Sequence, residues 1–127
     1  MATTAIKINR GTSWSTTYTH QHDGVPVDIT GATVYFTVKS QEYDSTQDDS
    51  TSIIEETVTS HVDPTNGVTN IELSPEQTSY IQEVAGNYIV PGQYTYDIKV
   101  KEADGSVYKT VEGKCTIDGS PTNRSVA

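Results

Sequence analysis

A strict alternation of apolar and polar side chains between positions 32 and 39 constrains the fold of this chain more than any other feature. The apolar row is Ala32, Val34, Phe36 and Val38, and the polar row is Thr33, Tyr35, Thr37 and Lys39. A period of two residues is typical of a β-strand that buries one side and exposes the other. We therefore expect a strand over residues 32–40 whose apolar row lies in a protein core.

Two segments near the C-terminus repeat this alternation. Residues 92–102 and 106–118 are separated by Asp104-Gly105, a dipeptide typical of tight turns, so they predict an antiparallel hairpin. The first strand is expected to carry on one face Tyr94, Tyr96, Ile98 and Val100. The second is expected to carry on one face Val107, Val111, Cys115 and Ile117.

Shorter elements are predicted between these strands. Strand patterns occur at residues 3–9, 12–20, 52–61 and 68–73, and the polar, acidic residues 41–51 predict an exposed loop. Asp23-Gly24 favours a type I′ turn, and residues 63–67 (DPTNG) favour a turn that joins the last two of these strands as a hairpin. Ser74, followed by proline and by glutamine at position 77, predicts a capped helix over residues 75–84.

About seven short strands and one short helix predict an all-β fold, an antiparallel β-sandwich of immunoglobulin-like type. A jelly roll or a small barrel is the alternative. The length of 127 residues favours one domain. We assign residues 12–118 to the sandwich, 1–11 to an N-terminal arm or edge strand, and 119–127 to a C-terminal tail.

The charge of the chain limits its partners. A formal net charge of −9 argues against binding to nucleic-acid phosphates and to anionic membranes. No apolar run approaches the length of a membrane span, and the N-terminal residues have no apolar core typical of a signal peptide. We therefore expect no membrane association and a cytoplasmic origin.

Two histidines form a candidate metal site. His20 and His22 are two residues apart, so on a strand both would point to the same side, with His61 or Asp23 as a distant third ligand. The competing interpretation is a pair of solvated histidines with no special role.

The sequence offers no catalytic arrangement, so we predict that the protein is not an enzyme and needs no cofactor. The chain has no G-x-S-x-G motif and no glycine-rich phosphate loop, and Glu55 and Glu56 would face opposite ways on a strand. Cys115 is the only cysteine, which rules out an intrachain disulfide and predicts a buried, inert thiol.

The chain contains eight tyrosines, a residue type enriched at protein interfaces. If they lie on outer sheet faces, a contact surface would be formed by Tyr35, Lys39, Tyr43, Tyr88 and Tyr108. Stacking on sugars and ordinary cross-strand pairing are the alternatives.

Four segments together resemble a known family. They are DGVPVDITGATVYFTVK (23–39), DPTNGVTNIELSPEQT (63–78), PGQYTYDIKV (91–100) and DGSVYKTVEG (104–113). This order is similar to the immunoglobulin-like domain at the N-terminus of phage baseplate upper proteins and to related small virion proteins of tailed bacteriophages.

The resemblance implies a structural, non-enzymatic virion component of the tail, baseplate or neck, or a capsid accessory (decoration) protein. Such a protein would assemble in the host cytoplasm and would dock on other virion structural proteins, in repeated copies or as a homo-oligomer. The alternative function is a module that binds carbohydrate on the host surface.

Overall fold

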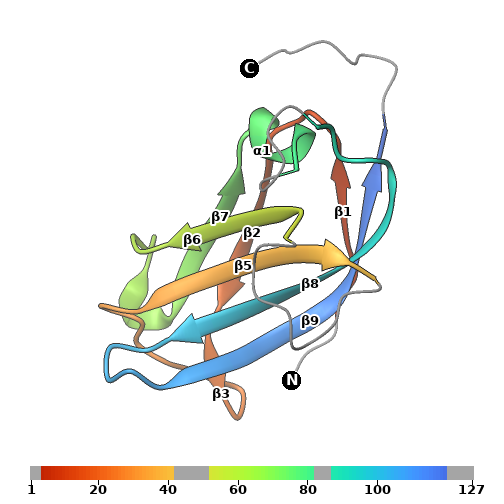
Figure 1. Cartoon of the computed structure of the whole chain (residues 1–127). Helices are drawn as coiled ribbons and strands as arrows, with labels where there is room; N and C mark the ends of the chain where they lie inside the picture. The colour runs from red at the N-terminus through yellow and green to blue at the C-terminus, as the bar shows by residue number, and fades with distance from the viewer. Residues whose placement is uncertain (1–3, 42–51, 82–86, 120–127) are drawn as a thin grey trace.

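In a computed structural model of the protein, residues 4–41, 52–81 and 87–119 are described. They form two β-sheets that pack face to face, with a short β-ribbon at one end and one short α-helix at the other (Figure 1). The predicted β-sandwich with one short helix is therefore confirmed. None of the helices in these residues is long and apolar enough to cross a membrane.

The larger sheet has five strands in the order β1-β9-β8-β5-β6. Its strands are β1 (Ile6–Asn9), β5 (Thr33–Ser40), β6 (Ile54–Val58), β8 (Gly92–Lys101) and β9 (Val107–Asp118). All neighbours are antiparallel except β1, which runs parallel to β9. The prediction of a purely antiparallel sandwich is wrong at this edge, because β1 and β9 are far apart in sequence and no hairpin turn fixes their relative direction.

The smaller sheet pairs β2 (Trp14–Thr19) with β7 (Val68–Leu73). The predicted hairpin between the strands at 52–61 and 68–73 is therefore wrong. β6 belongs to the larger sheet, and the turn that contains the 3₁₀-helix η2 (Pro64–Asn66) carries the chain across to the smaller one. The alternating pattern of β7 marks a buried face, but it does not identify the partner strand.

A two-stranded ribbon of β3 (Gln21–His22) and β4 (Val25–Pro26) extends the chain after β2. Asp23 and Gly24 at its tip have φ angles of 52° and 80°, which is the left-handed geometry of the predicted type I′ turn.

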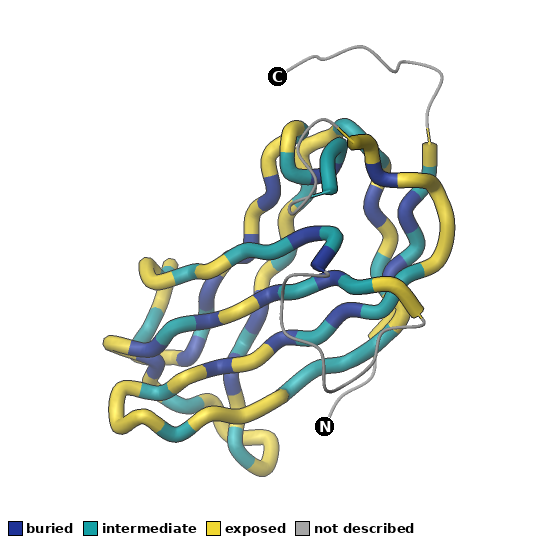
Figure 2. Tube along the Cα trace, viewed as in Figure 1, coloured by how far each residue is buried: buried dark blue, intermediate teal, exposed yellow. Residues whose placement is uncertain are grey.

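The core lies between the two sheets, and buried positions alternate along the strands (Figure 2). Val34, Phe36 and Val38 are fully buried, as predicted from their spacing. The ring of Trp14 on the smaller sheet stacks on that of Phe36 with 5.6 Å between ring centroids. Burial of each large apolar side chain contributes roughly 1.5–3 kcal/mol, so this interlayer contact is a main source of stability.

The helix α1 (Pro75–Ser79) is shorter than predicted. Its capping box is present, because Ser74 N–H donates to Gln77 Oε1 at 2.8 Å and Gln77 N–H donates to Ser74 Oγ at 3.2 Å. The helix ends at Tyr80, which is extended, and Ile89 N–H donates to the carbonyl of Ser79 at 2.9 Å. This long-range pairing replaces the next helical turn; residues 82–86 lie outside the described residues.

A β-bulge interrupts the β8–β9 hairpin. Ile98 lies opposite Val111, but Lys99 lies opposite Lys109, so Thr110 is an extra residue on β9. Alternation along β9 therefore changes phase at Thr110. Val107, predicted to share a face with Val111, Cys115 and Ile117, lies instead opposite Lys101 on the outer face and is 56% exposed, which corrects that prediction.

Candidate functional site

His20 follows β2 at a point where three segments meet. Its N–H donates to the carbonyl of Gly67 at 2.8 Å, and its own carbonyl accepts from the N–H of Val27 at 3.0 Å. Gly67 has a φ of +76°, and a Cβ at this position would lie only 2.6 Å from the carbonyl oxygen of Val27 and 2.7 Å from that of His20. The turn at residues 63–67 therefore needs glycine here, and it fixes the backbone of His20.

His20 and His22 converge on Glu102, which follows β8. Nε2 of each histidine lies 2.7 Å from the same carboxylate oxygen, Oε2 of Glu102. The side chain of His20 is only 1% exposed, whereas those of His22 and Glu102 are 39% and 17% exposed. The cluster thus joins a buried imidazole to a carboxylate that has access to solvent.

The histidines change the acidity of this carboxyl group. The hydrogen bond with His20, and then that with His22, hold the pKa of Glu102 below its ordinary value, against the opposing effect of desolvation. Glu102 is therefore a carboxylate at neutral pH.

The second ring nitrogen of His20 faces a chain of hydroxyl groups. Nδ1 lies 3.5 Å from Oη of Tyr18. The hydroxyl of Tyr18 donates to Oγ1 of Thr110, which donates in turn to the carbonyl of Ile98 at 3.4 Å. Burial raises the pKa of Tyr18, so this hydroxyl keeps its proton. The bulge residue Thr110 is therefore a partner of the site.

The bulge also directs Tyr108 to the inner side of the sheet, opposite Val100. Its ring meets that of His22 edge-on, with 4.7 Å between centroids and 77° between planes. Beside it lies a hollow of about 440 Å³ lined by residues 18–24 and 108–111. Two imidazoles and one carboxylate at such a hollow can hold a cation or share protons.

The structure brings the two predicted histidines together but gives them a different third partner. Neither His61 nor Asp23 is that partner, and the interpretation of His20 as a solvated residue is wrong. His61 instead bonds Oγ1 of Thr69 at 2.9 Å and the carbonyl of Ala32 at 2.8 Å. Glu102 is 80 residues from His22 in sequence, and no local pattern marks it.

The predicted tyrosine surface is not a single surface. Tyr35 lies on the outer face of β5, whereas Tyr108 lies on the inner side beside His22. Tyr88 stacks on Tyr80, with 5.0 Å between centroids, and the guanidinium of Arg10 lies 5.1 Å from its ring centre. Tyr43 falls outside the described residues.

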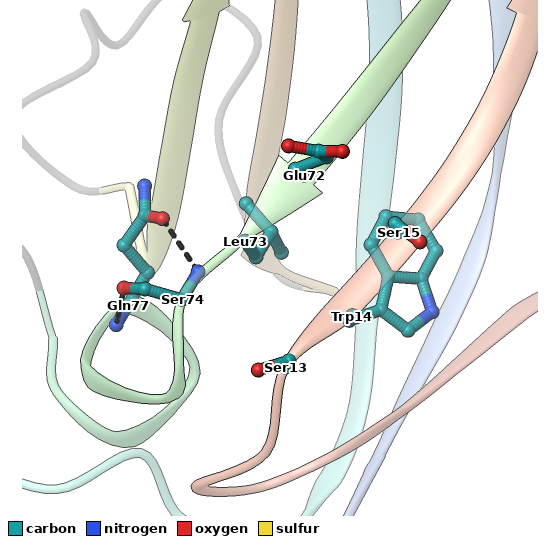
Figure 3. Close-up of a pocket in the computed structure, with 7 residues that line it drawn as sticks. All are labelled: Ser13, Trp14, Ser15, Glu72, Leu73, Ser74 and Gln77. Atoms are coloured by element: carbon teal, nitrogen blue, oxygen red, sulfur yellow. Dashed lines mark hydrogen bonds between the residues drawn. The ribbon is translucent and has the colours of Figure 1, made fainter. Parts of the chain in front are cut away.

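A second hollow, of about 480 Å³, lies where β2 and β7 approach the helix (Figure 3). Its lining includes Trp14, Ser74 and Gln77. The indole of Trp14 packs on Phe36, and Ser74 and Gln77 bond each other in the capping box. These groups therefore serve the core and the start of the helix.

All six lysines of the chain lie on the outer face of the five-stranded sheet, a feature that the sequence analysis missed. The strand registers and the alternation of buried positions assign to this lysine face Lys7, Lys39, Lys99, Lys101, Lys109 and Lys114. The carboxylates on the same face are Glu55, Asp97, Glu112 and Asp118. Six lysines against four carboxylates give this face a formal charge of +2, whereas the other described residues, with eight carboxylates and Arg10, carry −7.

Two ion pairs on the lysine face join described residues. Lys7 pairs with Asp118 at 3.0 Å and Lys109 pairs with Glu112 at 3.1 Å. Within the described part of the chain, Lys99, Lys101 and Lys114 have no salt-bridge partner.

No protein-family model and no curated protein matches this chain. Similar solved structures include the soluble domain of PmoD from Methylocystis sp., with 8% identity and a TM-score of 0.46 over 87% of this chain and 76% of that one. CopC from Methylosinus trichosporium has 12% identity and a TM-score of 0.44, over 92% and 88% of the two chains.

A putative glycoside hydrolase from Bacteroides vulgatus has 12% identity and a TM-score of 0.45 over 92% of this chain, which spans only 17% of the hydrolase. At identities of 8% to 12% and TM-scores below 0.5, these resemblances carry no functional assignment.

Proposed function

We propose that this chain is a non-enzymatic structural component of a tailed-phage virion, a protein-docking module of immunoglobulin-like type. Two independent features support the proposal. The first is the sequence resemblance to small virion proteins, and the second is the lysine face. The position would be in the tail, baseplate or neck, or on the capsid as an accessory protein.

The lysine face is the observation that carries the docking function. In a chain with a net charge of −9, lysines spread at random over the surface would neutralise carboxylates everywhere. Their concentration on one sheet face instead creates a field that steers and orients an acidic partner. Tyr35, 38% exposed, supplies an aromatic contact within this face.

The charge pattern favours a protein surface as the partner. A phosphate backbone is uniformly negative and needs a strongly basic footprint, whereas this face alternates lysines with carboxylates and reaches only +2. A protein surface with acidic groups and a few basic ones matches this alternation. The other described residues, at −7, are acidic themselves, so the lysine face of one copy could pack against an acidic side of the next copy.

Sheet edges offer a second mode of contact. β6 and β1 are the edge strands of the larger sheet, and each has one side without a neighbouring strand in the described sheet. Unpaired backbone groups on such edges accept an added strand from a partner.

Lysine footprinting tests the proposal. Particles made from a phage genome that encodes the chain would be purified and treated with an acetylating reagent, beside the isolated chain. Incorporation into particles and slower acetylation of Lys99, Lys101 and Lys114 in the particle are expected. Absence of the chain from purified particles would contradict a virion role, and unchanged acetylation of incorporated chain would contradict docking through this face.

Two matched double variants test whether incorporation depends on where the charge is changed or only on how much it is changed. Lys99→Gln with Lys114→Gln lowers the net charge by two units on the lysine face, and Ser60→Glu with Thr65→Glu lowers it equally at exposed positions outside the strands. The first pair is expected to reduce incorporation and the second to leave it unchanged. A glycan array on the isolated chain tests the carbohydrate alternative, which specific saccharide binding without incorporation would favour.

A further inference from the structure

We propose that His20, His22 and Glu102 bind one divalent transition-metal ion of the Zn²⁺ type. Each residue offers one ligand atom, and the three atoms lie within 4.8 Å of one another. Two imidazole nitrogens and a carboxylate oxygen form a donor set that Zn²⁺ and Cu²⁺ accept readily. The site lies at the end of the sandwich that carries the β3–β4 ribbon. The inference is therefore independent of docking through the lysine face.

The spacing of the ligand atoms fits an ion after a small adjustment. Bonds of about 2.0–2.2 Å at tetrahedral angles separate neighbouring ligand atoms by about 3.3 Å. The two Nε2 atoms now lie 2.7 Å from Oε2 of Glu102, which is hydrogen-bond distance. The Glu102 carboxylate, next to the hairpin turn, and the half-exposed ring of His22 would rotate so that these two distances widen and the two Nε2 atoms, which lie within 4.8 Å of each other, reach the same spacing.

The backbone holds the two histidines rigidly. His20 is fixed by Gly67 and Val27, and His22 lies in the β3–β4 ribbon opposite Val25. Their ring centroids are 5.1 Å apart. A site whose ligands are largely in place before the ion arrives loses little conformational entropy when the ion binds.

The hydroxyl chain behind His20 suits the metal-binding tautomer. A metal-bound Nε2 requires the proton on Nδ1, and a ligating histidine usually donates that proton to a neighbouring acceptor. Because Tyr18 donates its own proton to Thr110, its oxygen is free to accept from Nδ1 of His20, 3.5 Å away. Contraction of this contact is expected when the ion binds.

The surroundings leave room for a fourth ligand. The hollow beside the cluster has a volume of about 440 Å³ and is lined by His22, Asp23 and Tyr108. Three protein ligands with an open position are typical of zinc sites that bind water or an exogenous group. Such a site could take its fourth ligand from solvent or from a neighbouring protein.

Isothermal titration of the full chain, without a polyhistidine tag, with Zn²⁺ tests this inference. One ion per chain is expected, with Mg²⁺ and Ca²⁺ as non-binding controls because they prefer oxygen ligands. His22→Ala and Glu102→Gln are expected to weaken binding by about 100-fold or more, whereas Glu112→Gln, a second glutamate of the same hairpin, leaves it unchanged. Circular dichroism would verify that each variant is folded.

Cu²⁺ provides a spectroscopic check on the ligands. Electron paramagnetic resonance is expected to report two coordinated imidazole nitrogens in the native chain and one in His22→Ala. Tyr18→Phe removes the acceptor for Nδ1 and is expected to weaken Zn²⁺ binding by about 10-fold while both nitrogens remain. No stoichiometric Zn²⁺ binding, or binding that is equal in native chain, His22→Ala and Glu102→Gln, would overturn the inference.

Discussion

Lys99 lies directly opposite Lys109 across strands β8 and β9. Like charges in this position destabilise a sheet, yet the β-bulge at Thr110 brings the two together. Lys109 also pairs with Glu112, at 3.1 Å, which relieves part of the repulsion. The fold itself does not require this pair, whereas the docking role proposed for the lysine face would account for it.

Lys99→Glu is expected to stabilise the isolated chain. The substitution replaces a repulsive cross-strand pair with an attractive one and should raise the free energy of unfolding by about 0.5 kcal/mol, which urea denaturation measures. Lys101→Glu is the control, because Lys101 lies opposite Val107 and Thr33 and has no cation across the strand. An equal change in both variants would refute the cross-strand explanation.

Gly67→Ala is expected to destabilise the protein severely. Its positive φ is unfavourable for alanine, and the added Cβ would lie 2.6 Å from a carbonyl oxygen at a position that is buried. Together these effects should lower the free energy of unfolding by about 3 kcal/mol.

Gly24→Ala supplies the matched control for that variant. Gly24 has a similar φ of +80°, but nothing lies within 4 Å of the added Cβ. Only the backbone penalty of about 1 kcal/mol should remain. If urea denaturation gave the two variants the same loss, close packing around Gly67 would not be the cause.

Local patterns predicted the elements of this fold better than their pairing. The buried row of β5, the type I′ turn and the capping box depend on residues within a few positions of one another, and all three are confirmed. The parallel β1–β9 pair and the transfer of β7 to the second sheet depend on contacts between distant segments, which periodicity does not encode.

In the candidate sites, too, local patterns marked some residues, and only the tertiary fold brought in the others. His20 and His22 were recognisable from their spacing, but Glu102 joins them only through the tertiary fold. A single bulge residue, Thr110, moves Tyr108 from the predicted outer surface to the side of His22. The lysine face becomes visible only when five strands are in register, because its lysines come from four different strands.

A double-mutant cycle on Tyr18 and Thr110 should reveal strong coupling. Thr110→Val leaves the buried hydroxyl of Tyr18 without its acceptor, which should lower the free energy of unfolding by about 1–3 kcal/mol. Adding Tyr18→Phe removes the stranded hydroxyl, so the double variant should recover most of that loss. Strictly additive effects in urea denaturation would contradict a direct hydrogen bond between the two side chains.

The thiol of Cys115 should be unreactive in the folded protein. Burial raises its pKa from an ordinary value of 9.0 to about 12, and the residue is fully buried. Because the thiolate is the nucleophile, a thiol reagent at pH 8 should label Cys115 only after denaturant is added. Rapid labelling of the native protein would contradict this.

The same pKa shift makes the stability of the fold depend on alkaline pH. Below pH 9 the thiol is protonated in both the folded and the unfolded chain, so it contributes no pH dependence. Between pH 9 and about 12 the unfolded chain loses this proton while the folded chain keeps it, so the free energy of unfolding falls as pH rises. Cys115→Ala shares the other titrating groups but lacks the thiol, so its stability, measured by urea denaturation, should fall less steeply across this range. Parallel curves for the two proteins would show that the buried thiol does not carry the effect.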